Sequence, residues 1–216
     1  MLLKDDWLEQ YLGKAAYCFK PPFDEDQLPE GFIFAKTSAE DASSINVLIN
    51  KGFKQVETLV QFEQQRVVER RSIGFSVRAS KPEDENEVTA IAADAFVSSR
   101  LYQDPMIPNE VASKIKEEWV RNFYHGKRGD AMIVAEDEGR IMGFVLLIGD
   151  VIDLIAVSKQ DYKKGVASAM IAFINEEHGT FLKAGTQAIN EASIALYQKC
   201  GFVKVKETDV FHYHTK

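Results

Sequence analysis

The chain has 216 residues, of which 45% are hydrophobic and 11% aromatic, enough to bury one large core or two small ones. No apolar run approaches the roughly 18 residues that span a bilayer, and the first residues, MLLKDDWLEQY, lack the apolar core of a secretory signal. The net charge of −7 argues against general nucleic-acid binding, and Cys18 and Cys200 are too few for a disulfide framework. We therefore expect a cytoplasmic protein with no membrane or nucleic-acid partner.

The first part of the chain mixes short strands with one clear helix. Residues 31–36 (GFIFAK) are predicted to form a strand, and residues 38–53 a helix with Ser38 as its N-cap. A second strand is predicted over residues 54–64 (KQVETLVQFEQ). The charged stretch 64–74 (QQRVVERRSIG) that follows either joins two domains or pairs as an edge strand.

A more regular unit begins at residue 75. Apolar segments separated by short turns predict strands over residues 75–80, 131–137, 138–150 and 151–158. Helices are predicted over residues 81–100, where the first turn is acidic, and over residues 111–126, with a loop between them. Helices after the first and the last of these strands indicate an α/β or α+β fold, arranged as two domains, residues 1–74 and 75–216.

The chain also aligns with itself. Residues 37–62 match residues 186–211 without gaps at an offset of 149, and the matches include Ser44/Ser193, Gly52/Gly201 and Phe53/Phe202. Either two strand–helix–strand units agree by chance, or the N-terminal part is a degenerate copy of the C-terminal half. Leu48 stands where Tyr197 stands, so only the second copy carries a phenol that could act as an acid.

The loop and helix start after residue 157 suit an anionic ligand. In residues 161–168 (DYKKGVAS), Gly165 lets the backbone come close, Ala167 keeps the next turn slim, and Lys163 and Lys164 add positive charge. A helix N-terminus behind such a loop offers several N–H donors to a pyrophosphate. The alternatives are an ordinary helix cap and a solvated pair of lysines.

A second constellation lies near the C-terminus. Asn190 and Tyr197 are seven residues apart, about two helical turns, so both side chains lie on one face of a helix. A tyrosine hydroxyl at this place could supply a proton to a leaving group. The alternative is that Tyr197 is a core aromatic residue and Asn190 a helix N-cap.

Together these two elements resemble the GNAT superfamily of N-acetyltransferases. The stretch IAVSKQDYKKGVASAMI is similar to that family's acetyl-CoA-binding element, whose pattern is Arg or Gln, two residues, Gly, one residue, then Gly or Ala. Tyr162 departs from the Arg or Gln, at a position that contributes mainly its backbone N–H, and the later positions match. Asn190, Tyr197 and the pair Gly201-Phe202 match the family's Asn…Tyr…Gly-Phe arrangement.

The similarity to one branch of the family is closer. The segments AFVSSRLYQDPMIPNE, GTQAIN…LYQKCGF and VFHYH resemble dTDP-fucosamine acetyltransferase-like enzymes, which acetylate amino sugars on nucleotide carriers. This resemblance implies a GNAT-like mixed central sheet flanked by helices, with a smaller N-terminal α/β domain that resembles a partial GNAT half. It also implies a homodimer that uses acetyl-CoA as co-substrate and needs no metal.

The mechanism that the resemblance implies is direct attack of a primary amine on the thioester within a ternary complex. The residues expected to bind the cofactor are Ile155, Val157, Tyr162, Lys163, Lys164, Gly165, Val166, Ala167, Ser168 and Asn190. Tyr197 is expected to protonate the departing thiolate. Asp153 is a candidate base, because a carboxylate within an apolar strand is costly without a purpose or a partner. The alternative for Asp153 is a hydrogen-bonded edge or bulge residue.

Arg100 and Tyr102 are expected to bind the substrate, since they lie beside the loop that commonly shapes the acceptor pocket in this family. Arg100 could meet a pyrophosphate through bidentate contacts, and a surface ion pair is the alternative. His212 and His214 share one face of the last strand, but no third metal ligand is evident, so no metal site is predicted.

The leading substrate class is a nucleotide-linked amino sugar, and the resemblance implies dTDP as the carrier. One alternative is a small amine, an antibiotic or a protein N-terminus. Another, of a different class, is a non-catalytic acyl-CoA-binding regulatory module, which Tyr162 and the acidic overall charge would suit.

Overall fold

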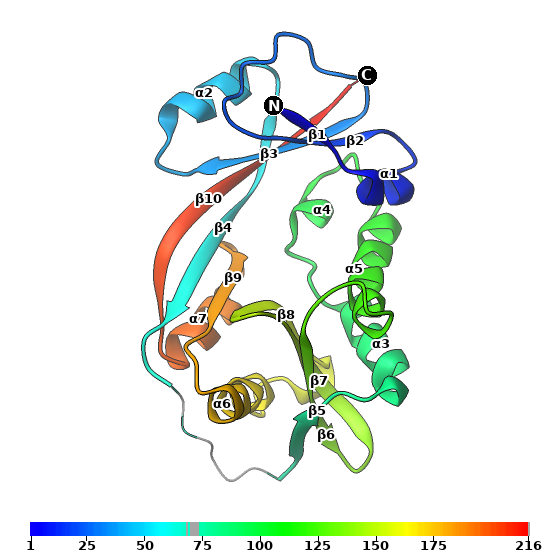
Figure 1. Ribbon diagram of the computed structural model, residues 1–216, viewed down its shortest axis with the longest axis vertical. Helices are drawn as coiled ribbons and strands as arrows, with labels where there is room; N and C mark the ends of the chain where they lie inside the picture. The colour runs from blue at the N-terminus through cyan, green and yellow to red at the C-terminus, as the bar shows by residue number, and fades with distance from the viewer. Residues whose placement is uncertain (68, 70–73, 216) are drawn as a thin grey trace.

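The computed structural model describes residues 1–67, 69 and 74–215, whose strands form one ten-stranded mixed sheet (Figure 1). The strand order is β1-β2-β3-β10-β4-β9-β8-β7-β6-β5. Helices pack on both faces of this sheet, which confirms the expected mixed sheet flanked by helices. In the described part of the chain, no helix is long and apolar enough to cross a membrane.

Most elements from β3 onward lie where strands and helices were predicted, whereas β1, α1, β2 and α4 were not predicted. The strands are β1 Leu2–Lys4, β2 Ala16–Phe19, β3 Phe32–Ser38, β4 Lys54–Gln64, β5 Ser76–Ala79, β6 Ala131–Asp137, β7 Arg140–Ile148, β8 Val151–Val157, β9 Lys183–Gln187 and β10 Phe202–His214. The helices are α1 Asp6–Leu12, α2 Ala42–Asn50, α3 Glu85–Asp94, α4 Arg100–Gln103, α5 Asn109–Tyr124, α6 Val166–His178 and α7 Glu191–Lys199.

The central strands are apolar throughout because both of their faces are covered. On one face, Val134 and Phe144 belong to a core cluster with residues of α3 and α5. On the other face, their neighbours Ile133 and Val145 belong to a cluster with residues of α6 and α7. Successive strand residues point to opposite faces, so a strand between two helical layers needs an apolar residue at every position.

Two predicted helices begin or end elsewhere than expected. The N-cap of α2 is Asp41, whose side chain accepts a hydrogen bond from the Ser44 N–H at 3.0 Å, so the prediction of Ser38 was wrong. Ser38 instead ends β3, where it pairs with Thr208 of β10. The helix predicted over residues 81–100 stops at Asp94, and Phe96 then has a φ of 62°, which a right-handed helix excludes.

The internal alignment corresponds to a structural repeat. Adding 149 to the bounds of α2 gives those of α7, and the units β3–α2–β4 and β9–α7–β10 interleave around the central pair β4–β10. The register repeats as well. Ser38 of β3 pairs with Thr208 of β10, and Gln187 of β9 pairs with Leu59 of β4, which are the same two positions shifted by 149. The two copies are therefore related by an approximate two-fold axis.

The copies differ where each meets the rest of the sheet. In the first, β2 and β3 pair in parallel along the whole of β2, from Ala16–Phe32 to Phe19–Ala35. In the second, β8 and β9 pair only at Val151–Lys183 and Ile152–Ala184.

The predicted division into two domains, residues 1–74 and 75–216, stays a prediction. In the described structure β10, from the C-terminal part, pairs with β3 on one side and with β4 on the other. Residues 68 and 70–73 of the charged stretch lie outside the described residues, and so does the choice between a linker and an edge strand.

Candidate active site

The strands β8 and β9 start side by side and then separate. After Ile152, no further residue of β8 is paired with β9 in the described structure. Among the described residues, the stretch from Leu154 to Val157 is paired with β7 on its other edge only. An open strand edge can take an extended ligand as an added strand. Ile155 and Val157, two of the predicted cofactor residues, belong to this stretch.

Asp153 lies where the two strands separate. The register between β7 and β8 shifts at this residue, which makes it a bulge residue. Its two carboxylate oxygens each accept a hydrogen bond from the Arg128 guanidinium, both at 2.8 Å. The alternative considered for Asp153, a hydrogen-bonded bulge residue, therefore describes its geometry. To take a proton from an amine, Asp153 would have to open this bidentate ion pair.

Helix α6 begins with unsatisfied backbone donors. No side chain caps it at Gly165, which has a φ of 83° that favours glycine. The N–H groups of Val166, Ala167 and Ser168 have no backbone acceptor in the described part of the chain. The exposed Tyr162 and Lys163 flank the same turn. These donors and the positive end of the helix dipole form a site suited to a phosphate group.

The loop before α6 is held by a carboxylate that the sequence analysis missed. Asp161 is fully buried and accepts hydrogen bonds from Arg140 of β7 at 2.6 and 3.1 Å and from Lys164 at 2.9 Å. The Arg140 guanidinium holds the pKa of Asp161 below its usual range. Lys164 is therefore paired with a carboxylate, so Lys163 is the lysine of this pair whose charge is available to a ligand.

Asn190 and Tyr197 have the structural roles that were considered as alternatives. Asn190 is the N-cap of α7, and its Oδ1 accepts a hydrogen bond from the Ser193 N–H at 3.2 Å. Tyr197 is 2% exposed, and its ring centroid lies 5.6 Å from that of Phe62 and 5.3 Å from that of Phe202. Burial raises the pKa of Tyr197, so the phenol stays protonated at neutral pH.

Packing does not use the hydroxyl of Tyr197. This group has no hydrogen-bond partner among the described residues, although the ring is in the core. Tyr197 belongs to an apolar cluster that also contains Ile152 of β8, Val166 of α6 and Ala184 of β9, that is, residues of the two separating strands and of the helix between them. The position is therefore compatible with proton donation toward this region.

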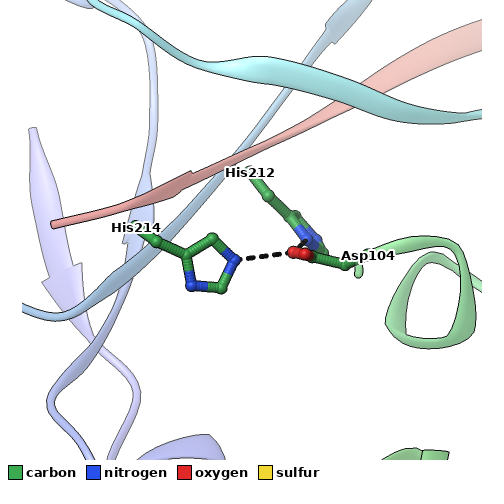
Figure 2. Close-up of side chains that lie close together, drawn as sticks. All are labelled: Asp104, His212 and His214. Carbon is green, nitrogen blue, oxygen red and sulfur yellow. Dashed lines mark hydrogen bonds and ion pairs between the residues drawn. The ribbon is translucent and has the colours of Figure 1, made fainter. Parts of the chain in front are cut away.

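Arg100 is held by a network that joins α4 to the end of β10. Figure 2 shows Asp104 between two imidazoles, with its Oδ2 2.6 Å from Nδ1 of His212 and 2.7 Å from Nε2 of His214. Arg100 donates to Nε2 of His212 at 3.0 Å, and Lys14 donates to Nδ1 of His214 at 3.0 Å. This pattern assigns each ring a neutral tautomer with its proton on the nitrogen that faces Asp104.

Asp104 is the acidic neighbour of the two histidines that sequence order did not reveal, because it is 108 residues away from His212. The three potential ligand atoms lie within 4.8 Å of one another. However, the outer nitrogen of each imidazole meets a cation, Arg100 or Lys14, and a positive charge there opposes a bound metal ion. We therefore interpret the three residues as a hydrogen-bond network that positions Arg100.

Further charged side chains surround Arg100 on the inner side of α5. We refer to Glu57, Arg100, Lys116, Arg128 and Asp153 as the inner charged cluster; they come from β4, α4, α5, the loop before β6, and β8. The other four all act electrostatically on Lys116, the most buried of them. The predicted Arg100 and Asp153 are therefore both charged neighbours of Lys116.

The predicted Tyr102 lies elsewhere. It packs against an apolar cluster that contains Leu8 of α1 and Ile115 of α5. Lys116 was missed by the sequence analysis, although the pattern carried a signal for it. It occupies an inward position of α5, next to Ile115 and four residues before Val120, where an apolar residue is expected.

Comparisons with known proteins agree with this geometry. Residues 128–204, which contain β6 to α7, match the family model described as an acetyltransferase (GNAT) domain. The chain is similar to the spore coat polysaccharide biosynthesis protein SpsD of Bacillus subtilis (strain 168), with 28% identity over 193 residues, 85% of this chain and 66% of that protein.

Solved structures share the fold. A GCN5-related N-acetyltransferase from Sphaerobacter thermophilus superposes with a TM-score of 0.59 at 14% identity, over 84% of this chain and 59% of that one. A tandem GNAT protein from the clavulanic acid biosynthesis pathway gives a TM-score of 0.59 at 11% identity, over 84% of this chain and 63% of that one. The chain thus spans just under two thirds of the length of these relatives.

The matched residues coincide with the part of the fold that holds the separated strands and the uncapped start of α6. The same part holds the predicted acetyl-CoA pattern and Tyr197. Residues 128–204 of this chain therefore match an acetyltransferase (GNAT) domain, and the chain shares the fold of solved acetyltransferases.

Proposed function

We propose that the protein is an acetyl-CoA-dependent N-acetyltransferase that moves an acetyl group to a primary amine by direct attack in a ternary complex. The observation that carries this proposal is the position of the open edge of β8 directly before the uncapped start of α6. An extended pantetheine arm needs the first feature and a pyrophosphate needs the second.

Every predicted cofactor residue except Lys164, which is paired with Asp161, has a part in this proposal. Ile155 and Val157 offer backbone groups to the pantetheine amides, and the first turn of α6, from Gly165 to Ser168, offers N–H groups to the pyrophosphate. Tyr162 and Lys163 flank the phosphates. A backbone N–H of the separated strand receives the thioester oxygen as negative charge develops on it. Asn190 and Tyr197 complete the set, with Tyr197 donating a proton to the sulfur.

We assign a positioning role to Asp153. Its carboxylate holds Arg128 at the point where β8 leaves β9, through two hydrogen bonds of 2.8 Å. Arg128 in turn lies over the Trp119 ring of α5, with its Cζ 5.1 Å from the ring centroid. This chain of contacts ties α5 to the proposed thioester site.

For the acceptor we propose a nucleotide-linked amino sugar. The relative SpsD is named for polysaccharide biosynthesis, which supports a sugar substrate. Arg100 and Arg128 supply positive charge that would suit the phosphates of a nucleotide carrier. We further propose that the protein works as a homodimer in the cytoplasm, as the family resemblance implies.

Thermal unfolding with saturating acetyl-CoA, followed by thiol release, tests this function. At about 100 times the dissociation constant, a ligand of the folded state raises the Tm by roughly 5 °C or more in a domain of this size. Thiol release is then measured with dTDP-linked amino sugars, free amino sugars, small amines and a peptide N-terminus. Turnover fastest on the dTDP-linked sugars supports the proposal.

The other outcomes separate the alternatives. Fast turnover on a small amine or on the peptide keeps the acetyltransferase and replaces the sugar. Stabilisation by acetyl-CoA without turnover on any amine points to a regulatory acyl-CoA-binding module. If saturating acetyl-CoA leaves the Tm unchanged, both acetyltransferase hypotheses, with a sugar or with another amine as acceptor, are overturned.

A further inference from the structure

Lys116 is a buried amine without a hydrogen-bonding or ionic partner. The residue is 5% exposed, and no described residue accepts a hydrogen bond from its Nζ or forms an ion pair with it. Its Nζ lies 3.7 Å from the centroid of the Trp119 ring and 5.5 Å from that of the Phe96 ring. Burial disfavours the ammonium form, and the two ring faces, which attract a cation, offset part of this cost.

The charges that face Lys116 come from four other segments. Arg100 of α4 and Arg128 of the loop before β6 disfavour a second positive charge, whereas Glu57 of β4 and Asp153 of β8 favour it. Burial, the largest effect, lowers the pKa of Lys116 to about 7. A large fraction of this side chain is therefore a neutral amine at neutral pH, with a lone pair on Nζ.

The position of Lys116 connects it to the separated strands. The Trp119 ring that contacts its Nζ also contacts the Arg128 guanidinium. Arg128 is in turn paired with Asp153 at the start of the open edge of β8. Phe96, the other ring beside Lys116, sits on a backbone with a φ of 62°. An aromatic residue adopts that conformation only when its surroundings impose it, as happens in functional sites.

We propose that Lys116 is the proton acceptor for the attacking amine, directly or through one water molecule. This inference rests on the proposed acetyltransferase function and adds to it the base that Asp153, paired with Arg128, is poorly placed to supply. No other described lysine is both this buried and free of an ion pair.

The acceptor arrives as R–NH3⁺ and gives one proton to the neutral Nζ of Lys116, which becomes an ammonium. The freed lone pair forms the C–N bond, and the C–S bond breaks with its electron pair on sulfur. Nitrogen then loses a second proton to solvent, and the thiolate gains a proton from Tyr197, whose phenolate takes one back from solvent. Lys116 returns its proton to solvent before the next turnover.

The pH profile of acetyl transfer to a dTDP-linked amino sugar tests this role. Variants Lys116→Gln and Lys116→Arg both remove a base that works near neutral pH, because Arg stays protonated. Each is expected to lower kcat by roughly a hundredfold at pH 8. Lys114→Gln, an exposed lysine of the same helix, is the matched control and keeps the wild-type rate.

The ratio of wild-type to Lys116→Gln rates cancels the titration of the free substrate amine. We expect this ratio to be constant above about pH 8 and to fall about tenfold per pH unit below about pH 6. Each variant must also show the wild-type rise in Tm with acetyl-CoA, which establishes that its cofactor site is folded. If Lys116→Gln is active and the ratio of wild-type to variant rates does not change with pH, the inference is overturned and the proposed function still stands.

A direct titration makes the inference testable even if the acceptor is another amine. The Nζ signal of isotope-labelled lysine that disappears in Lys116→Gln is followed by NMR from about pH 5 to pH 10. A midpoint near neutrality supports the proposal, and a midpoint close to that of an ordinary lysine overturns it. Acetylation of Lys116 by acetyl-CoA alone, seen by mass spectrometry, also overturns it, because the residue would then be an acyl acceptor. Loss of turnover in the wild-type protein on every amine would instead contradict the proposed function.

Discussion

At the scale of single residues, Tyr197 has a hydroxyl that the fold does not need. Its counterpart in the first copy of the repeat, Leu48, is fully buried without any hydroxyl. We therefore predict that Tyr197→Phe folds with a Tm within about 2 °C of the wild type, since no partner is left unsatisfied. Turnover should fall more than about tenfold, because the proton donor to the thiolate is lost. Thiol release measures the turnover and calorimetric titration the acetyl-CoA affinity, which should be nearly unchanged.

A matched substitution controls for the loss of a phenol. Tyr213→Phe changes a tyrosine of β10 that packs on Phe53, in the cluster of the N-terminal half. It should retain wild-type turnover. Full activity of Tyr197→Phe would remove this hydroxyl from the mechanism and leave Tyr197 as a core residue.

Single residues also mark the limit of prediction from sequence. Local patterns identified Asn190 and Tyr197, because their spacing along one helix is a short-range property. Asp161 and Lys116 were missed, since what distinguishes them is burial against Arg140 and Trp119, residues brought to them by the fold. For Asp153, the sequence raised the bulge as an alternative, but only the structure shows Arg128 as the partner.

At the scale of elements, the Asp104–His212–His214 network fastens β10 to the turn after α4. His212 is 2% exposed, and burial lowers its pKa to about 4. In the unfolded chain its pKa is near the ordinary value of about 6.5, so between these two values the unfolded state binds a proton that the folded state does not. The free energy of unfolding should therefore fall by roughly 3 kcal/mol as the pH falls from about 6.5 to about 4.

Chemical denaturation across this pH range measures the effect. His212→Asn should be less stable than the wild type at pH 7, because hydrogen bonds to Asp104 and Arg100 are weakened, and its stability should depend less on pH. The control is His125→Asn, which removes an exposed histidine and should leave the wild-type slope. An identical slope in His212→Asn and the wild type would contradict a neutral buried imidazole.

The elements themselves were predicted well wherever a residue period was clear. Strands β6 and β7 contain long apolar runs bounded by turns, and the amphipathic pattern of α5 was correct in place. The boundaries of α2 and α3 were less accurate. Two acceptable caps, Ser38 and Asp41, stand three residues apart, and strand pairing with Thr208 decides between them. No local sequence pattern predicts the left-handed backbone conformation of Phe96, which the predicted helix could not include.

At the scale of the whole molecule, the repeat explains why only one half resembles a catalytic domain. Both copies contain a strand–helix–strand unit with the same register. In the second copy the 13-residue helix α6 lies between β8 and β9, and these strands separate after two pairs. In the first copy no helix lies between β2 and β3, and these strands pair along all four residues of β2. The alignment at offset 149 revealed the repeat from sequence, whereas the separation required the structure.

The same symmetry supplies a matched test of the proposed cofactor contact of Asn190. Asp41 and Asn190 are equivalent positions, and each caps its helix by accepting a hydrogen bond from a backbone N–H, at 3.0 Å from Ser44 and 3.2 Å from Ser193. Asp41→Ala and Asn190→Ala should each lower the Tm by about 3 °C, since each loses one N-cap. Only Asn190→Ala should also weaken acetyl-CoA binding, by about tenfold in calorimetric titration at a temperature where both variants are folded, because the first copy lacks the open strand edge. Equal affinities in the two variants would mean that Asn190 is a helix cap and does not touch the cofactor.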